Sequence, residues 1–240
     1  MFDIVSHQLD VPPPPPSIVT SSLLVHLDAG DSSSYSGSGT TWYNLVSGGN
    51  NATLYNGPTY SSSDGGYFHF DGSNDHVRMS NSGFNNPSAW PYTGGKGNFT
   101  YETWVNFDTT GSYYTIFENG SWTDCLLLRH QSNKLYLYAE GLLLWNLSWT
   151  PTTGTWYNIV LKRQVYNFYL YINNSLIGSL SYSPAPSINI SNNYIYLMGS
   201  QHSSSQRFDG KMSVFMVYDK ALSDSERQEN YDTLKGRYGY

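Results

Sequence analysis

The chain has 240 residues, with 12 Lys and Arg against 18 Asp and Glu, and a formal net charge of −6. Because the charges are spread without a basic stripe, nucleic acid is excluded as the main partner. One cysteine cannot make a disulfide framework, and no stretch reaches the roughly 18 to 20 apolar residues of a membrane span. The abundance of tyrosine (22), with only 12% charged residues, favours one all-β domain with a polar, weakly charged surface.

Residues 1–22 differ in composition from the rest of the chain. Five consecutive prolines cannot join a sheet ladder, and they predict an extended polyproline II rod. Two interpretations stay open, an arm that anchors the domain to another component and a disordered tail. Residues 1–10 lack a basic segment followed by an apolar run, so we expect no Sec-type export signal. The prolines expected to make arm contacts are Pro12, Pro13, Pro14, Pro15 and Pro16.

From residue 23 onward, short segments rich in Tyr, Val, Ile and Trp alternate with Gly, Asn, Ser and Asp, which predicts strands joined by turns. Apolar residues alternate over 99–107, so we expect a central strand with one buried face. Asn173 and Asn174 can supply the positive φ angles of a tight hairpin turn. The predicted strands are 23–27, 42–46, 52–55, 67–70, 99–107, 113–118, 124–130, 134–139, 142–147, 156–163, 167–172, 175–181, 194–198 and 210–218.

The pattern changes near the C-terminus. Ser223 is followed three residues later by Glu226, which is the spacing of a capping box and predicts a helix over 224–235. The succession of short strands before it is typical of a sandwich or barrel. We therefore expect two parts, an extended arm over 1–22 and one β domain over 23–240.

Three groups of segments carry a family pattern in order along the chain. They are 24–30 with Trp42, 57–60 and 68–77; 99–105 with 156–160 and 169–173; and 208–223 with Glu226, 230–231 and 235–238. Together they resemble the LamG-like, concanavalin A-like jelly-roll domain, in the version found in many phage and large DNA virus structural proteins. The resemblance implies a two-sheet antiparallel jelly-roll sandwich with a role in adhesion, glycan binding or particle assembly. Such folds host lectins, hydrolases and scaffolds, so the site has to decide the function.

Glycoside hydrolysis requires two cooperating carboxylates, and sandwich-fold glucanases place theirs in a Glu-x-Asp-x-Glu run on one strand. No such run occurs here. Glu102 lies on the predicted central strand, where we expect a structurally paired or solvent-facing carboxylate. The histidines lack the spacing of metal ligands. We therefore expect that the chain is not an enzyme.

Calcium is the one cofactor that stays open. Many LamG-like domains bind it at the rim of the sandwich, and the resemblance implies Asp71, Asp75 and Asp209 as ligands. Ser213 stands where calcium-binding relatives often have an acidic residue, which removes one anionic ligand. The alternative for Asp71 and Asp209 is an Asx turn, in which the carboxylate accepts a hydrogen bond from the backbone two residues later.

Aromatic residues in predicted loops are candidate contacts for a glycan or a partner protein, because exposed rings stack on sugars and bury well at interfaces. The alternative is that they fill the core. The loop over 84–96 is the expected recognition surface. The candidate contacts are Trp90, Tyr92, Tyr113, Tyr114, Trp122 and Trp145.

Two functions remain open. The first is a non-catalytic virion structural protein, a minor capsid, decoration or fibre-associated component, whose arm docks on other virion or capsid proteins. The second is a carbohydrate-binding lectin module for host or environmental glycans, located outside the cell or on its surface. A tyrosine-rich, weakly charged surface is also compatible with a homo-oligomer.

Overall fold

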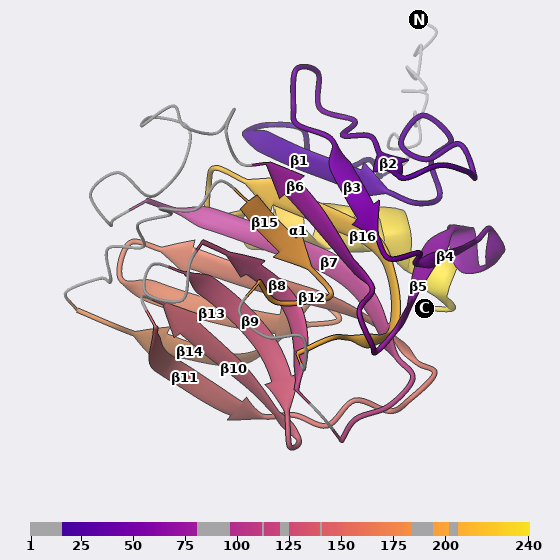
Figure 1. Ribbon diagram of the computed structural model, residues 1–240. Coiled ribbons are helices and arrows are strands. Elements are labelled where there is room, and N and C mark those ends of the chain that lie inside the picture. The colour runs from indigo at the N-terminus through magenta and orange to yellow at the C-terminus, as the bar shows by residue number, and fades with distance from the viewer. Residues whose placement is uncertain are drawn as a thin grey trace, which may run out of the picture.

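The chain forms the two-sheet antiparallel sandwich that the sequence predicts, with one short α-helix near the C-terminus (Figure 1). In Figure 1 one sheet faces the viewer and the other lies behind it, so we call them the front sheet and the back sheet. The computed structural model describes residues 16–80, 97–111, 113–120, 125–139, 141–183, 194–201 and 206–240.

The back sheet has the strand order β14-β13-β12-β7-β16-β5-β4, and β1 pairs with β16 beside this path. Asn173 and Asn174 have φ angles of 48° and 60°, which confirms the predicted hairpin turn between β13 and β14. The strands are β1 (Leu23–Asp28), β4 (Thr59–Ser61), β5 (Tyr67–Asp71), β7 (Phe99–Phe107), β12 (Trp156–Gln164), β13 (Asn167–Ile172), β14 (Ser175–Ser181) and β16 (Asp209–Tyr218).

The front sheet has the order β11-β10-β9-β8-β15-β6-β3-β2. Apolar side chains such as Leu54, Val77 and Ile195 face the back sheet, and the residues that alternate with them along their strands face away from it. The strands are β2 (Thr41–Trp42), β3 (Ala52–Tyr55), β6 (His76–Ser80), β8 (Tyr114–Asn119), β9 (Leu126–Gln131), β10 (Lys134–Ala139), β11 (Leu142–Ser148) and β15 (Tyr194–Leu197).

The main core lies between the two sheets and is rich in aromatic rings. Tyr101 of β7 stacks on Phe117 of β8 with ring centroids 4.6 Å apart and planes 6° apart, so this pair joins the two layers. Asn119 Nδ2 donates a hydrogen bond of 3.0 Å to the Tyr101 hydroxyl. The polar tip of a buried ring is thus satisfied within the core.

A second core lies on the outer face of the back sheet, beneath α1 (Asp224–Leu234) and the following 3₁₀ turn η2 (Lys235–Tyr238). Ser223 Oγ accepts from the Glu226 amide and Glu226 Oε2 accepts from the Ser223 amide, which confirms the predicted capping box. Trp104 of β7 packs under this segment, 4.2 Å from the ring of Tyr238. Strand β7 is therefore buried on both faces, whereas its alternation predicted one.

Two short strands were not predicted, and one is shorter than predicted. Of the segment expected over 42–46, only Trp42 lies in a strand, β2. After it, the Asn44 side chain forms hydrogen bonds with the backbone of β1 in the back sheet, so the chain leaves the front sheet. β4 has only three residues, which is too short for a clear pattern. β6 does alternate, with Val77 and Met79 buried between more exposed polar residues, and the sequence reasoning overlooked this short alternation.

The N-terminal segment enters the domain beside α1. Val19 is buried in the second core, and its backbone N–H donates a 2.9 Å hydrogen bond to Asn230 Oδ1 of the helix. Pro16 is exposed, and Pro12 to Pro15 lie outside the described residues. The chain is thus fixed to the helix side of the sandwich at Val19.

Candidate functional site

Glu102 is a structural carboxylate enclosed beneath α1. It is 1% exposed, and its two carboxylate oxygens accept hydrogen bonds from Asn158 Nδ2 (3.0 Å) and Asn230 Nδ2 (2.8 Å). Burial raises the pKa of Glu102 to about 7, against the lowering effect of the two amides. Without access to solvent it has no route to a substrate, and it ties the helix to the back sheet instead.

At one rim of the sandwich, the structure brings together His69, Asp108 and Asp209, each half-buried, with ligand atoms within 4.8 Å of one another. His69 Nε2 and Asp108 Oδ2 are 2.8 Å apart, and Lys211 Nζ lies 3.7 Å from Asp108 Oδ1. Asp209 Oδ2 accepts a 2.8 Å hydrogen bond from Thr109. Two carboxylates therefore converge here, each already held by a cationic or hydroxyl partner.

The three residues predicted to bind calcium do not form the rim cluster together, because only Asp209 belongs to it. Asp71 pairs with Asp209 across β5 and β16, but its Oδ1 accepts the Ser73 amide at 2.8 Å, which is the Asx turn named as the alternative. This backbone hydrogen bond lowers the pKa of Asp71. Asp75 is buried, and burial raises the pKa of its carboxyl.

The rim cluster fits calcium poorly. Ca²⁺ prefers six to eight oxygen ligands, whereas this group offers one imidazole nitrogen and two carboxylates. The Lys211 ammonium beside Asp108 already supplies a positive charge. A nitrogen donor with two carboxylates suits a transition metal better than calcium.

The predicted aromatic contacts divide into three groups. Tyr113 is 44% exposed at the start of β8, whereas Tyr114 is buried against Phe107 and Phe208. Trp145 of β11 is half-buried at the edge of the sandwich, where a side chain on Gly178 of β14 would come within 2.6 Å of its ring. The loop over 84–96, with Trp90 and Tyr92, and Trp122 lie outside the described residues.

The outer face of the front sheet carries a group of side chains that the sequence reasoning missed. Their strands, β3, β6 and β15, are adjacent, and their alternate residues Leu54, Val77 and Ile195 point into the core. The opposite residues therefore share the outer face. This group, which we call the His76 stack, consists of Tyr55, His76, Arg78, Tyr194 and Tyr196, all half-buried.

Ring contacts hold the His76 stack together. The imidazole of His76 lies parallel to the ring of Tyr55, 5.0 Å away and at 7°, and stacks on Tyr196 at 5.8 Å and 20°. The guanidinium of Arg78 lies 4.5 Å from the ring centroids of both Tyr55 and Tyr194. Burial lowers the pKa of His76, and Arg207 and Arg78 lower it further, so the imidazole stacks as the neutral form near pH 7.

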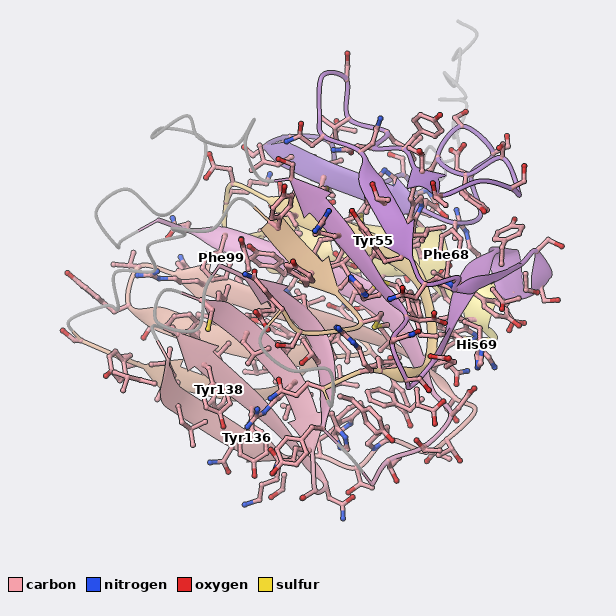
Figure 2. All side chains as sticks on the ribbon, viewed as in Figure 1. Tyr55, Phe68, His69, Phe99, Tyr136 and Tyr138 are labelled. Carbon is pink, nitrogen blue, oxygen red and sulfur yellow. The ribbon has the colours of Figure 1, made fainter. Side chains whose placement is uncertain are left out.

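A second group, the Arg129 cluster, lies on the same face toward the other end of the sheet. The guanidinium of Arg129 is 4.6 to 5.7 Å from the ring centroids of Tyr113, Tyr136 and Tyr138, and its Nη2 donates to the Tyr138 hydroxyl at 2.7 Å. Figure 2 shows Tyr55 toward one end of this face and Tyr136 and Tyr138 toward the other. Of the predicted contacts, Tyr113 alone belongs to either group among the described residues.

Between the two groups the face is closed. Thr115, Glu118 and Leu127 point outward from β8 and β9 by register, yet each is at most 1% exposed. Tyr196 and Glu118 are cross-strand partners, and so are Glu118 and Leu127. The sheet therefore presents two separate aromatic groups with a buried centre.

These features define a two-sheet antiparallel β-sandwich with an aromatic outer face. A family model described as the concanavalin A-like lectin/glucanases superfamily matches residues 71–226, and the chain belongs to this superfamily. That name covers both lectins and glucanases, so membership alone does not decide between binding and catalysis. No curated protein matches the sequence.

Solved structures similar to this chain include the binding domains of botulinum neurotoxins. The serotype D/C binding domain has a TM-score of 0.70 at 14% identity, and the serotype G binding domain has 0.68 at 16%. These matches cover 89% and 87% of this chain but 52% and 50% of the neurotoxin chains, so the chain spans about half of their length. At such identity the likeness establishes the fold. Within the described residues, no helix has the length and apolar character needed to cross a membrane.

Proposed function

We propose that this chain is a non-catalytic carbohydrate-binding module and that the His76 stack is the centre of its binding surface. The observation that carries the proposal is the assembly of three tyrosines, one neutral histidine and one arginine from three neighbouring strands into one stacked, half-buried group. Tyrosine offers a flat apolar ring for the face of a sugar and a hydroxyl for hydrogen bonds.

The stack is also rigid before any ligand arrives. Its side chains sit on strands rather than loops, and each ring is fixed by a neighbour, so little rotamer entropy remains to be lost on binding. Sites of this kind gain affinity from preorganisation. The sequence contains the alternation of this face, in 76–80 and 194–197, but not the pairing of the strands that brings the rings together.

The similar solved structures support a binding role in general, without naming a ligand for this chain. One neurotoxin binding domain similar to this chain is described in complex with SialylT, and a second similar structure is described with the finding that cell entry of botulinum neurotoxin type C depends on interaction with two ganglioside molecules. Those ligands belong to the neurotoxins, of which this chain spans about half. Extending carbohydrate binding to this chain is our proposal.

A glycan array and isothermal titration with the best ligand test the proposed site. We expect Tyr55→Ala and Tyr194→Ala each to weaken binding about tenfold, since one stacked ring contributes on the order of 1 kcal/mol or more. The matched control is Tyr169→Ala on the back sheet, whose ring also lies over a cation, Lys162, at 4.9 Å. This control should bind as the wild type does.

Three results would contradict the proposal. The first is the absence of binding to any saccharide, and the second is an equal loss with the control variant. The third is a loss of binding in a chelator that added metal restores, which would move the site to the rim cluster. Release of reducing sugar that Asp108→Asn abolishes would overturn the non-catalytic part.

A structural role in a virion is a second proposal, supported by the attachment of the chain at Val19. Val19 attaches the N-terminal segment to the helix side of the back sheet, away from the His76 stack. In this proposal the prolines that precede Val19 in the sequence dock on capsid proteins while the front sheet faces outward. The two functions are therefore compatible in one particle.

A further inference from the structure

We propose that the ligand of the front sheet is an anionic oligosaccharide whose carboxylate or sulfate groups bind Arg78 and Arg129. This inference rests on the proposed carbohydrate-binding function and names its ligand class.

The front sheet has the opposite charge balance to the whole chain. The chain carries 18 acidic and 12 basic residues. The eight strands of the front sheet contain three basic side chains, Arg78, Arg129 and Lys134, and one acidic side chain, Glu118. Glu118 is buried, and Arg207 lies close enough for its charge to be felt there. The charges that this face presents outward are thus positive.

Arg78 is held as a fixed hydrogen-bond donor. Tyr55 and Tyr194 cover its guanidinium, and the hydroxyls of Tyr55 and Tyr196 accept hydrogen bonds from it. A guanidinium has five N–H groups in a planar fork, so donors remain after these two. Within the described residues Arg78 forms no ion pair. Its fork therefore suits a carboxylate or sulfate supplied by a ligand.

Arg129 repeats this arrangement at greater depth. It is 7% exposed, and in the part of the chain that the structure describes it has no acidic partner. Its Nε is buried without a hydrogen-bond partner, while three tyrosine rings surround the guanidinium. Among the described residues no counter-ion offsets the cost of burying this cation, and the rings offset only part of it. The carboxylate or sulfate of a bound ligand would pair with the Arg129 guanidinium.

The distance between the two arginines suits an oligomer. β6 and β9 are separated by β15 and β8, so three inter-strand spacings of about 4.8 Å place the two strands about 14 Å apart. One acid group cannot reach both positions. A chain of sugars with repeated acid groups can contact both ends of the face.

Matched acidic and neutral saccharides test the inference by isothermal titration with the full chain. The probes are oligogalacturonate and its methyl ester for carboxylates, and dextran sulfate and dextran for sulfates. We expect at least one acidic probe to bind about tenfold or more tightly than its neutral partner, as charge-assisted hydrogen bonds predict. Added salt should weaken this binding.

Substitutions of the two arginines then test which side chains bind the acid groups of the ligand. Arg78→Gln and Arg129→Gln should each lower the affinity for the acidic probe about tenfold, and each should lower the affinity for the neutral probe by a smaller factor. Lys235→Gln, which removes the same charge beside α1, is the control and should change neither. Arg78→Lys keeps the charge without the planar fork and should bind with intermediate affinity. Thermal unfolding confirms that each variant is folded.

The outcomes separate the two proposals. Equal affinity for acidic and neutral probes overturns the anionic ligand and leaves carbohydrate binding standing. Acidic binding that both arginine variants retain also overturns it, because the charge would then lie elsewhere. If no saccharide of either kind binds, the proposed function fails and this inference fails with it.

Discussion

Glu102 shows how one buried side chain can set the response of the whole domain to pH. Within the part of the chain that the structure describes, its carboxylate has two amide donors and no cation in hydrogen-bond contact. Burial raises its pKa from 4.5 to about 7, so between these values the folded protein keeps a proton that the unfolded chain has lost. The stabilising contribution is complete below pH 4.5 and is lost as the pH rises through 7.

We predict that Glu102→Gln flattens this part of the pH dependence. Relative to the variant, the wild type should lose up to about 3 kcal/mol of unfolding free energy between pH 4.5 and pH 7.5. Urea unfolding at a series of pH values measures the difference. Glu229→Gln, at an exposed carboxylate of α1, is the matched control. Parallel curves for the wild type and Glu102→Gln would show that Glu102 is ionised throughout.

At the level of single residues, the sequence predicted what local chemistry decides. The Asx turn at Asp71 depends on the next two residues, so it was recognisable as an alternative to a calcium ligand. The His76 stack depends on the pairing of β3, β6 and β15, which lie far apart in the chain. No sequence spacing brings Tyr55 next to His76, and the stack was therefore missed.

The elements follow the same rule. The hairpin at Asn173 and the capping box at Ser223 were predicted because turns and helix ends are encoded over a few residues. The burial of the second face of β7 was not predicted, because the element that covers this face, α1, follows β7 by more than 100 residues in the sequence. Burial by a distant element leaves no local periodicity.

Two N-terminal deletions test how much the packing of Val19 stabilises the domain. Removing residues 1–15 should leave the melting temperature unchanged, because the described contacts that bury Val19 come from α1, η2 and the back sheet. Removing residues 1–22 should destabilise the domain by about 2 to 3 kcal/mol, since it exposes the apolar contacts of Val19 and leaves Asn230 Oδ1 without its donor.

Differential scanning calorimetry of the two deletions decides this prediction. A domain of this size loses roughly 2 to 4 °C per kcal/mol. Equal melting temperatures for both deletions would show that Val19 adds no stability. A loss of stability on removing 1–15 would place part of the proline segment against the domain.

For the whole molecule, the two outer faces have different tasks. The outer face of the back sheet is covered by α1 and the segment around Val19, so its apolar side chains are buried in the folded domain. The front sheet keeps tyrosine and arginine on its outer face. The sandwich architecture and the superfamily were predictable from the ordered family pattern, whereas the choice of the front face needed the packing of the helix.

NMR chemical-shift mapping shows directly whether the His76 stack contacts the saccharide. The labelled protein is titrated with the tightest oligosaccharide from the array. If the His76 stack binds the saccharide, the largest chemical-shift changes fall on residues of β3, β6 and β15, with Tyr55, Arg78 and Tyr194 among them. Shifts confined to β12, β13 and β14, to α1 or to the rim around Asp108 would contradict it.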